Sequence, residues 1–346
     1  MNLFEHCCSR ILTYAFALAV CLVLALGIVS PAFANTSGRE FRDAAKQEFL
    51  IPGLDTSFVP QGLSYDERSD AFFIGGYAYD SSADPIYMVD RASGEPLKVV
   101  YLLDPKGDAQ TSHGGGLLVH GDYVYLAGST EACLYVYDYH DIIAASDGAQ
   151  IACLGSIPLG TTQDTMRISW VSSTDDALVV GEFNYTYLSF YRIGVEAGYN
   201  DNYGLEYRAR AAFFTFSDSE DSRFGIEQTP SALLYLPDKT QGFAYDDNTV
   251  YISTSRLLGR GRILVYDLSA AEKVDVIKSE DGSIPVYVLG VSALLNKAVS
   301  IPMAEEIEIV DERLYIISEG ASKLFFVGPA LGCQWCYSVD LEFLMQ

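Results

Sequence analysis

Several polar side chains of types that can do chemistry stand at the edges of short apolar runs in this 346-residue sequence. His113 precedes three glycines, and Glu305 follows a Met-Ala pair at the start of another apolar run. Histidine and carboxylate side chains can act as general bases that activate a water molecule. We therefore predict His113 and Glu305 as the catalytic residues if the protein is an enzyme.

A second group of polar residues also lies near the edges of short apolar runs and could bind a ligand. Their amide, carboxylate and guanidinium groups would supply hydrogen bonds and charge to a small polar molecule. These residues are Gln61, Gln241, Glu182, Asn184, Arg256 and Glu319.

A divalent cation is a second kind of ligand for part of this group. Carboxylate and amide oxygens are ligands that calcium accepts, and a bound cation can polarise a carbonyl group for hydrolysis. The metal set that we predict is Glu305, Glu182 and Asn184, with calcium as the candidate ion and no other cofactor indicated.

Familiar catalytic motifs are absent from the sequence. It has no GxSxG elbow, Walker loop, dinucleotide-binding fingerprint, HExxH motif or EF-hand loop. Residues 113–116, His-Gly-Gly-Gly, match the oxyanion loop of esterases in letters only, because no nucleophile on a strand-to-helix turn accompanies them. A serine-hydrolase mechanism therefore has no support.

An internal repeat identifies the elements that must position these residues. Five segments begin with a short run led by a small or polar residue and continue through an Asp-rich turn into a second and a third apolar run. Short strands rich in β-branched and aromatic residues, with no amphipathic helix between them, are typical of the blades of a β-propeller. We predict an all-β propeller of five four-stranded blades. The alternative is six blades, if residues 194–239, which we treat as an insertion, contain another. The segments open at residues 61–65, 115–119, 168–171, 241–245 and 305–309.

The repeat also assigns the outer strands of the blades. In the third segment we place the third strand at residues 188–191 and a candidate fourth strand at residues 211–216. The fifth segment lacks a fourth strand, so residues 48–51 should supply it, close the ring and pair both terminal edges. The fourth strands predicted in the first, second and fourth segments are residues 97–102, 150–154 and 286–289.

Blade geometry sorts the polar residues onto two faces. The start of each first strand and the end of each second strand open on what we call the upper face, where all the candidate site residues fall. The turns that join the first to the second strand, and the third to the fourth, open on the lower face. Aspartates in those turns, such as Asp66 and Asp267, are expected to accept hydrogen bonds from nearby backbone N–H groups and to be structural.

The N-terminal residues have the pattern of a signal peptide. Arg10 ends a short polar start, residues 11–29 are apolar, and Ala32 and Ala34 form the small-x-small pattern of a cleavage site. We expect residues 1–34 to be removed, leaving one secreted, extracellular propeller domain of residues 35–346. The alternative is that residues 11–30 remain as a membrane anchor.

Secretion would make the remaining cysteines oxidisable. Cys133 and Cys153 lie in successive strand-like runs, so a hairpin with its turn near Ile143 would place them opposite each other. We predict a disulfide between them. Cys333 and Cys336 form a lone CxxC, which suits a local bridge or two unreactive thiols better than a zinc site.

The charge of the chain restricts its partners. It has 22 Lys and Arg against 46 Asp and Glu, a formal net charge of −24. Such a surface repels phosphate backbones and anionic lipid headgroups. We therefore expect a monomer that binds neither nucleic acid nor, after signal cleavage, a membrane.

The blade openings resemble those of a known group of proteins. Residues 59–63 (Val-Pro-Gln-Gly-Leu), 113–117 (His-Gly-Gly-Gly-Leu), 241–243 (Gln-Gly-Phe) and 303–306 (Met-Ala-Glu-Glu) resemble openings in secreted bacterial β-propellers. The resemblance extends distantly to the gluconolactonase/regucalcin-like and phytase-like-esterase propellers of the six-bladed-like superfamily, over about residues 41–341. In the gluconolactonase-like group an acidic residue before the first-blade glycine helps to hold a divalent cation, usually Ca²⁺. Here Gln61 and Gln241 occupy such positions, and only the fifth opening has carboxylates, at Glu305 and Glu306.

Two classes of function follow. We expect an extracellular propeller that binds a small polar ligand, glycan or peptide at the upper mouth of its central channel. Gln61 and Gln241 stand where the gluconolactonase-like group has a cation-binding acidic residue, and this difference favours a binding protein. The alternative is a divalent-cation-dependent hydrolase of the lactonase or esterase type.

Overall fold

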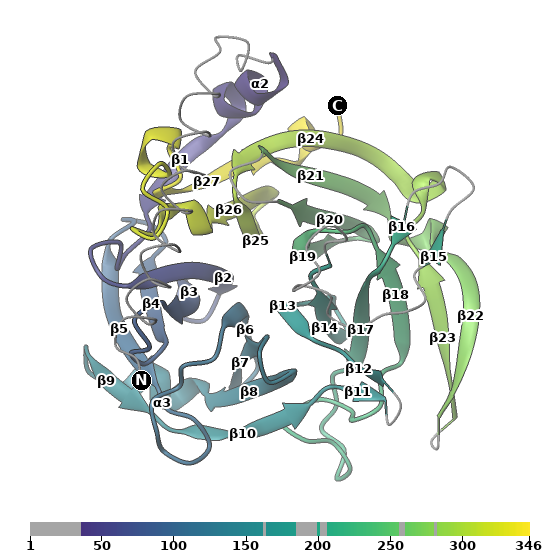
Figure 1. Cartoon of the computed structure of the whole chain (residues 1–346), viewed down its shortest axis with the longest axis horizontal. Helices are drawn as coiled ribbons and strands as arrows, with labels where there is room; N and C mark the ends of the chain where they lie inside the picture. The colour runs from purple at the N-terminus through teal and green to yellow at the C-terminus, as the bar shows by residue number, and fades with distance from the viewer. Residues whose placement is uncertain (1–35, 162–163, 185–198, 201–205, 256–259, 280–281) are drawn as a thin grey trace, which may run out of the picture. The chain divides into compact units, whose positions relative to one another are not determined.

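The computed structural model describes residues 36–346 except 162–163, 185–198, 201–205, 256–259 and 280–281. The chain divides into two compact units, Met1–Glu40 and Phe41–Gln346. The second unit is a five-bladed β-propeller, with its strands arranged in blades around a ring (Figure 1). The all-β fold and the number of blades predicted from the sequence are confirmed, and the six-bladed alternative is wrong.

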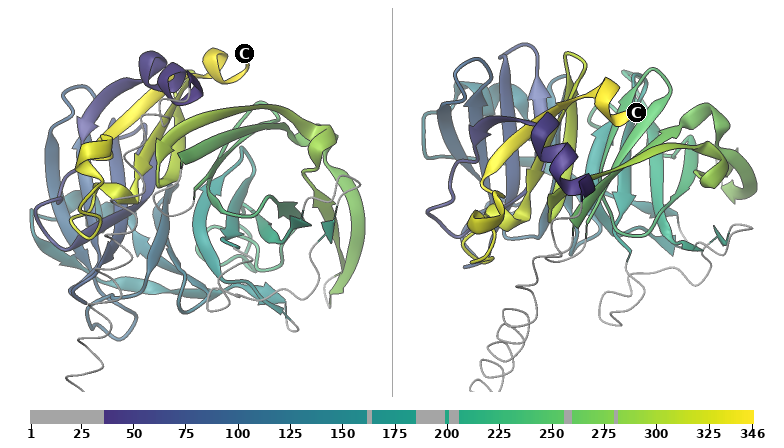
Figure 2. Two further views of the ribbon diagram at one scale, coloured as in Figure 1. Left: turned by 45° about the horizontal axis from the view of Figure 1, so that its top comes forward. Right: turned by 90° about the horizontal axis from the view of Figure 1, so that it is seen from above.

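The first strands of the five blades surround the centre of the ring, and the strands run between its two faces (Figures 1 and 2). The first blade is β2 (Phe58–Asp66), β3 (Ala71–Ala78), β4 (Pro85–Asp90) and β5 (Pro96–Leu102). The second is β6 (Gly114–His120), β7 (Tyr123–Gly128), β8 (Cys133–Asp138) and β10 (Cys153–Pro158). The third is β13 (Ile168–Ser173), β14 (Ala177–Glu182), β17 (Ala209–Thr215) and β18 (Ala232–Leu236). The fourth is β19 (Thr240–Asp246), β20 (Thr249–Thr254), β21 (Arg260–Asp267) and β24 (Leu294–Pro302). The fifth is β25 (Ala304–Val310), β26 (Arg313–Ser318), β27 (Trp335–Asp340) and β1 (Lys46–Leu50).

Smaller elements connect or flank the blades. The strands outside the four-stranded pattern are β9 (Ala149–Ile151), β11 (Gly160–Thr161), β12 (Asp164–Thr165), β15 (Tyr199–Asn200), β16 (Glu206–Tyr207), β22 (Glu272–Ser279) and β23 (Gly282–Val288). The helices are α2 (Thr36–Ala44), α3 (Tyr139–Ala144) and α4 (Leu341–Leu344), with short 3₁₀ turns at Leu268–Ala270, Val291–Ala293, Glu319–Ala321 and Pro329–Leu331. No helix in the described part of the chain has the length and apolar character needed to cross a bilayer. Residues 1–34, which contain the predicted signal peptide, lie outside the described residues.

The ring is closed by the N-terminal strand β1. It pairs antiparallel with β27, with Lys46 opposite Ser338 and Leu50 opposite Trp335. The N-terminal strand therefore completes the last blade, as predicted from residues 48–51.

Three outer-strand predictions are wrong, because an apolar pattern shows that a strand exists but not which strand it pairs with. Residues 150–154 are divided between two blades, since β9 adds in parallel to β5 of the first blade and β10 begins at Cys153. Residues 286–289 fall in and just after β23, which pairs in parallel with β18 of the third blade, and the fourth blade ends in β24 instead. Residues 194–239 are not simply an insertion, because they include β17 and β18, and residues 211–215 belong to the third strand of that blade. The predicted strand at residues 188–191 lies outside the described residues.

The core consists of five apolar clusters, one between each pair of neighbouring blades. Between the third and fourth blades, for example, the rings of Trp170 and Phe243 stack with their centroids 5.7 Å apart. Because both faces of a blade are covered by its neighbours, inner strands can be apolar on both sides. All six residues of β14 are buried.

The predicted disulfide between Cys133 and Cys153 is wrong. The two residues do lie on paired strands, but Cys133 is opposite Pro158 and Cys153 is opposite Tyr137. Four residues of strand separate them, roughly 13 Å, which is beyond the reach of a disulfide. All four cysteines in the described residues are free.

Candidate functional site

A layer of β-bulges encircles the ring near the upper face. Each first strand loses register with its second strand at the same level, as the pairing of Gln61, Ser169 and Gln241 with their partner strands shows. A bulge leaves extra residues out of the ladder and turns their side chains in a new direction. The bulges coincide with the blade openings of the sequence repeat. The bulged residues are Gln61, Gly115, Gly116, Ser169, Gln241, Glu305 and Glu306.

The first strands approach one another so closely at this level that side chains are excluded at several glycines, of which Gly116 and Gly242 adjoin Glu306. A Cβ atom on Gly116 would lie 2.6 Å from the backbone nitrogen of Val171 and 2.8 Å from Oε2 of Glu306. A Cβ atom on Gly242 would lie 2.8 Å from Cα of Glu306. The glycines therefore leave room for the Glu306 side chain to reach from the fifth blade toward its neighbours.

Four of the predicted site residues meet at this layer. Nε2 of Gln241 donates a hydrogen bond to Oε1 of Glu305 at 3.0 Å, and Nε2 of Gln61 donates to Oε2 of Glu319 at 3.4 Å. Gln61 and Glu305 are buried, whereas Gln241 and Glu319 are half-buried. Two amide–carboxyl pairs from the first, fourth and fifth blades thus form one polar cluster, which we call the mouth cluster.

Burial and mutual repulsion keep the carboxyl groups of the mouth cluster protonated to an unusual extent. Desolvation, followed by the nearby charges of Glu319 and Glu306, raises the pKa of Glu305 well above its ordinary value. Desolvation raises the pKa of Glu319 to about 7, against the opposing effect of the hydrogen bond from Gln61. A protonated carboxyl can donate as well as accept a hydrogen bond. At neutral pH the mouth cluster therefore presents both hydrogen-bond donors and hydrogen-bond acceptors.

Below the mouth cluster, two more carboxyl groups of β25 join blades together. Oε1 of Glu306 accepts from the backbone N–H of Phe243 at 3.4 Å, and Oε2 of Glu308 accepts from that of Tyr65 at 3.3 Å. Desolvation raises the pKa of Glu306 well above its usual range and that of Glu308 to about 7. Because their partners are backbone groups of the fourth and first blades, these two side chains have a structural role.

His113 lies at the junction of the first and second blades. Its ring is 4.1 Å from that of Tyr77, centroid to centroid, and it keeps access to solvent. The surrounding protein desolvates the imidazole and lowers its pKa to about 4, so the ring is neutral at physiological pH. The hydrogen bonds of the described residues do not link His113 directly to Glu305.

The predicted metal set does not fit its surroundings. Arg210 donates from Nε to Oε2 of Glu182 at 2.9 Å and from a terminal nitrogen to Oε1 at 3.0 Å, so it occupies both carboxylate oxygens. Both side chains are buried. Asn184 is also buried, and its backbone oxygen accepts from the N–H of Lys239 at 2.9 Å. Within the described residues, no group of three or more His, Cys, Asp or Glu side chains is arranged to hold a metal ion.

Two arginines also concern the predicted site, one that was predicted and one that was missed. Arg256, predicted to bind the ligand, lies outside the described residues. Arg210 was missed, although an arginine inside the apolar run of residues 209–214 is a detectable signal, because a buried arginine requires a partner.

The fold and the polar mouth define the class of protein as a five-bladed β-propeller with carboxyl and amide groups at the upper end of its ring. No protein-family model matches the chain, and no curated protein matches it. Similar solved structures include a glutaminyl cyclase from Myxococcus xanthus, with 11% identity over 86% of this chain and 94% of the other and a TM-score of 0.44. The PQQ-bound aldose sugar dehydrogenase from Streptomyces coelicolor is 12% identical over 86% and 97% of the two chains, with a TM-score of 0.44. BamB from Moraxella catarrhalis is 11% identical over 81% and 84%, with a TM-score of 0.33. Similarity at this level assigns no activity to the chain.

Proposed function

We propose that this propeller is a binding protein that takes a small polar ligand at the mouth cluster. The observation that supports the proposal is the meeting of two amide–carboxyl pairs, Gln61 with Glu319 and Gln241 with Glu305, from three blades. Side chains held by a rigid ring of blades are well suited to recognition, because they lose little freedom when a ligand binds.

A ligand that carries amide groups fits this chemistry best. The mouth cluster offers amide N–H groups, protonated carboxyls that donate, and carboxyl oxygens that accept, which together complement both ends of a peptide group. The rings of His113 and Tyr77 add a solvent-accessible aromatic surface at the junction of the first and second blades. Among the polar ligands expected from the sequence, we therefore favour a short peptide over a glycan at this site.

The proposal is tested with a panel of N-acetylated, C-amidated dipeptides and saturation-transfer NMR. We expect at least one dipeptide to bind the wild-type protein. Glu305→Gln and His113→Ala should weaken binding by at least about tenfold, which corresponds to about 1.4 kcal/mol. Glu305→Gln should change the free energy of unfolding by less than about 1 kcal/mol, because glutamine has nearly the same shape and its amide oxygen can still accept from Gln241.

The matched controls lie on the lower face. Asp267→Ala and His140→Ala should leave dipeptide binding unchanged. Equal losses from both faces, or no binding by any dipeptide of the panel, would refute binding at the mouth cluster.

One observation favours hydrolysis as a second candidate function. Glu319 is partly accessible, and its pKa of about 7 suits a group that takes up and releases protons near neutral pH. Assays with p-nitrophenyl acetate and glucono-δ-lactone, with and without calcium, test this candidate. Turnover that is lost in Glu319→Gln would support it. A rise in melting temperature when calcium is added after dialysis would show that the protein binds the ion.

A further inference from the structure

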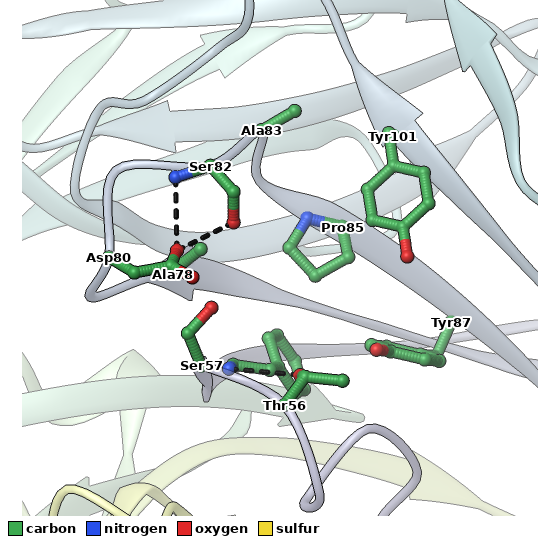
Figure 3. Close-up of a pocket in the computed structure, with 10 residues that line it drawn as sticks. Thr56, Ser57, Ala78, Asp80, Ser82, Ala83, Pro85, Tyr87 and Tyr101 are labelled. Carbon is green, nitrogen blue, oxygen red and sulfur yellow. Dashed lines mark hydrogen bonds between the residues drawn. The ribbon is translucent and has the colours of Figure 1, made fainter.

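A concave site separate from the mouth cluster lies on the outer part of the first blade, at its upper end. Three segments line a pocket of about 240 Å³: the approach to β2, the connection from β3 to β4, and the upper ends of β4 and β5 (Figure 3). Pockets for drug-sized ligands measure roughly 300–1,000 Å³, so this pocket suits a molecule with a single ring.

One wall of the pocket is apolar and aromatic. Pro85 on β4 is directly opposite Tyr101 on β5, and Tyr87 follows Pro85 two residues later on the same face of its strand. Tyr101 is half-buried, so its ring is partly open to solvent. Figure 3 shows the rings of Tyr101 and Pro85 side by side, with Tyr87 completing the wall. The wall offers an apolar platform against which a ligand ring can pack.

The opposite side of the pocket is polar. Asp80, Ser82, Ser57 and Thr56 lie there (Figure 3). Oδ1 of Asp80 accepts from the backbone N–H of Ser82 at 3.0 Å and from its hydroxyl at 2.7 Å. These bonds, the hydroxyl first, lower the pKa of Asp80 and keep it ionised. This side of the pocket therefore combines a carboxylate with the hydroxyl groups of three Ser and Thr residues.

Hydrogen bonds of Asp84 hold the connection that carries Asp80 and Ser82 in place. The buried carboxyl of Asp84 accepts from the N–H of Ala78 at 3.3 Å. The backbone N–H of Asp84 donates to the oxygen of Gln110 at 2.7 Å, and its backbone oxygen accepts from the N–H of Leu102 at 2.9 Å. Both ends of the connection from β3 to β4 are thus hydrogen-bonded within the blade, so the pocket is formed before a ligand arrives.

The lining chemistry selects one class of ligand. No basic residue lines the pocket, and the carboxylate disfavours anions. A simple ammonium ion is less well matched, because it has no apolar face to pack against the tyrosine wall. A sugar ring has an apolar C–H face for the tyrosine wall and several hydroxyl groups for the polar side.

We propose that this pocket, separate from the mouth cluster, binds a single saccharide ring, packed on Tyr101 and hydrogen-bonded to Asp80, Ser82 and Ser57. Such a site would let the protein hold a terminal sugar of a glycan independently of any ligand in the ring. It requires no chemical step.

The test uses saturation-transfer NMR on the full chain with a panel of methyl glycosides of glucose, galactose, mannose and N-acetylglucosamine. We expect at least one glycoside to bind with its ring C–H protons closest to the protein. Tyr101→Ala and Asp80→Asn should each weaken that binding by at least about tenfold. Tyr101→Phe, which keeps the ring, should retain it.

Two control variants distinguish this pocket from the rest of the protein surface. Tyr79→Ala removes an exposed tyrosine that does not line the pocket and should leave glycoside binding unchanged. Glu305→Gln should also leave it unchanged, so a failure of the mouth cluster and a failure of this pocket can be told apart. Binding that survives both Tyr101→Ala and Asp80→Asn, the absence of binding by every glycoside, or stronger binding of ethylammonium chloride than of any glycoside would overturn the proposal.

Discussion

The lower-face turns that follow the third strands and the mouth cluster use polar residues in different ways. In these turns, a carboxylate binds groups that lie two or three positions away in the sequence, as Asp90 does with Ser93, Asp138 with Asp141 and Asp267 with Ser269. In the upper part of the ring, the partners come from other blades: Gln61 is 258 positions from Glu319, and Gln241 is 64 positions from Glu305. Lower-face turns can form locally, whereas the mouth cluster exists only when the ring is assembled.

The largest expected effect tests a buried pair near the upper end of the third blade. Arg210→Ala should lower the free energy of unfolding by about 3–5 kcal/mol, because it removes a buried positive charge and both of its hydrogen bonds to the buried carboxylate of Glu182. Urea denaturation measures this loss. The double variant Glu182→Gln with Arg210→Met should recover much of it, since no buried charge remains. A loss below about 1 kcal/mol in Arg210→Ala would show that the pair is not desolvated.

A smaller effect is expected from the most heavily bonded lower-face aspartate. Asp66 is buried and accepts from the N–H and hydroxyl of Ser69, from Arg68 and from the hydroxyl of Tyr139. Asp66→Ala should cost about 2 kcal/mol of stability, because several hydrogen bonds to a charged group are lost. Dipeptide binding at the mouth cluster should be unaffected. If it is lost in a variant that remains folded, the two faces are not independent.

The pH dependence of stability distinguishes the carboxyls of the ring from those of the lower face. The pKa of Glu308 is about 7 in the folded protein, above its ordinary value, so the unfolded chain gives up this proton at lower pH than the folded protein does. Stability from this group is therefore present at acidic pH and falls as pH rises toward 7. Between pH 5 and pH 8, wild type should lose about 2 kcal/mol relative to Glu308→Gln.

Denaturation curves at several pH values give this difference directly. The low pKa of His113 has the opposite sign, because the unfolded imidazole takes up a proton below its ordinary pKa of 6.5. That contribution is shared by both proteins and cancels in the comparison. A difference that does not change with pH would mean that Glu308 is ionised throughout in the folded state.

The smallest effect is expected at an exposed histidine–aspartate contact on the lower face. His140 lies 3.2 Å from Asp122, and both side chains are mostly exposed. His140→Ala should change stability by less than about 0.5 kcal/mol, since exposed pairs contribute little. Thermal melts at low and high salt check this expectation, and a change above about 1 kcal/mol would contradict it.

The repeat in the sequence was sufficient to predict the blades, because each blade carries its own apolar runs and Asp-rich turns. It also predicted the closing role of residues 48–51, since an unpaired last blade requires a partner. It failed for β9 and β23, which add in parallel to the edge of an earlier blade. Nothing in the composition of an edge strand specifies which edge it joins.

The candidate site was predicted in part for a similar reason. Gln61, Gln241, Glu305 and Glu319 share the upper end because their positions follow from the order of strands. The pairing of Glu182 with Arg210 could not be derived, because the two residues come from strands joined by a long connection whose length hides their register. The pocket at Tyr101 was also missed, because its lining combines three segments that carry no common pattern.

The closure of the ring has a consequence for how the protein is made. The hydroxyl of Ser338 donates to Glu48 across 290 positions. Strand β1 therefore cannot pair until β27, near the end of the chain, is available. Contacts of such long range are formed late and slow the folding of a chain. Until β27 arrives, β1 is an unpaired edge that can join the wrong partner. A polypeptide that stops short of β27 therefore cannot close the ring. Its strand β1 keeps an unpaired edge that can bind other strands, and this edge distinguishes an incomplete chain from a complete one.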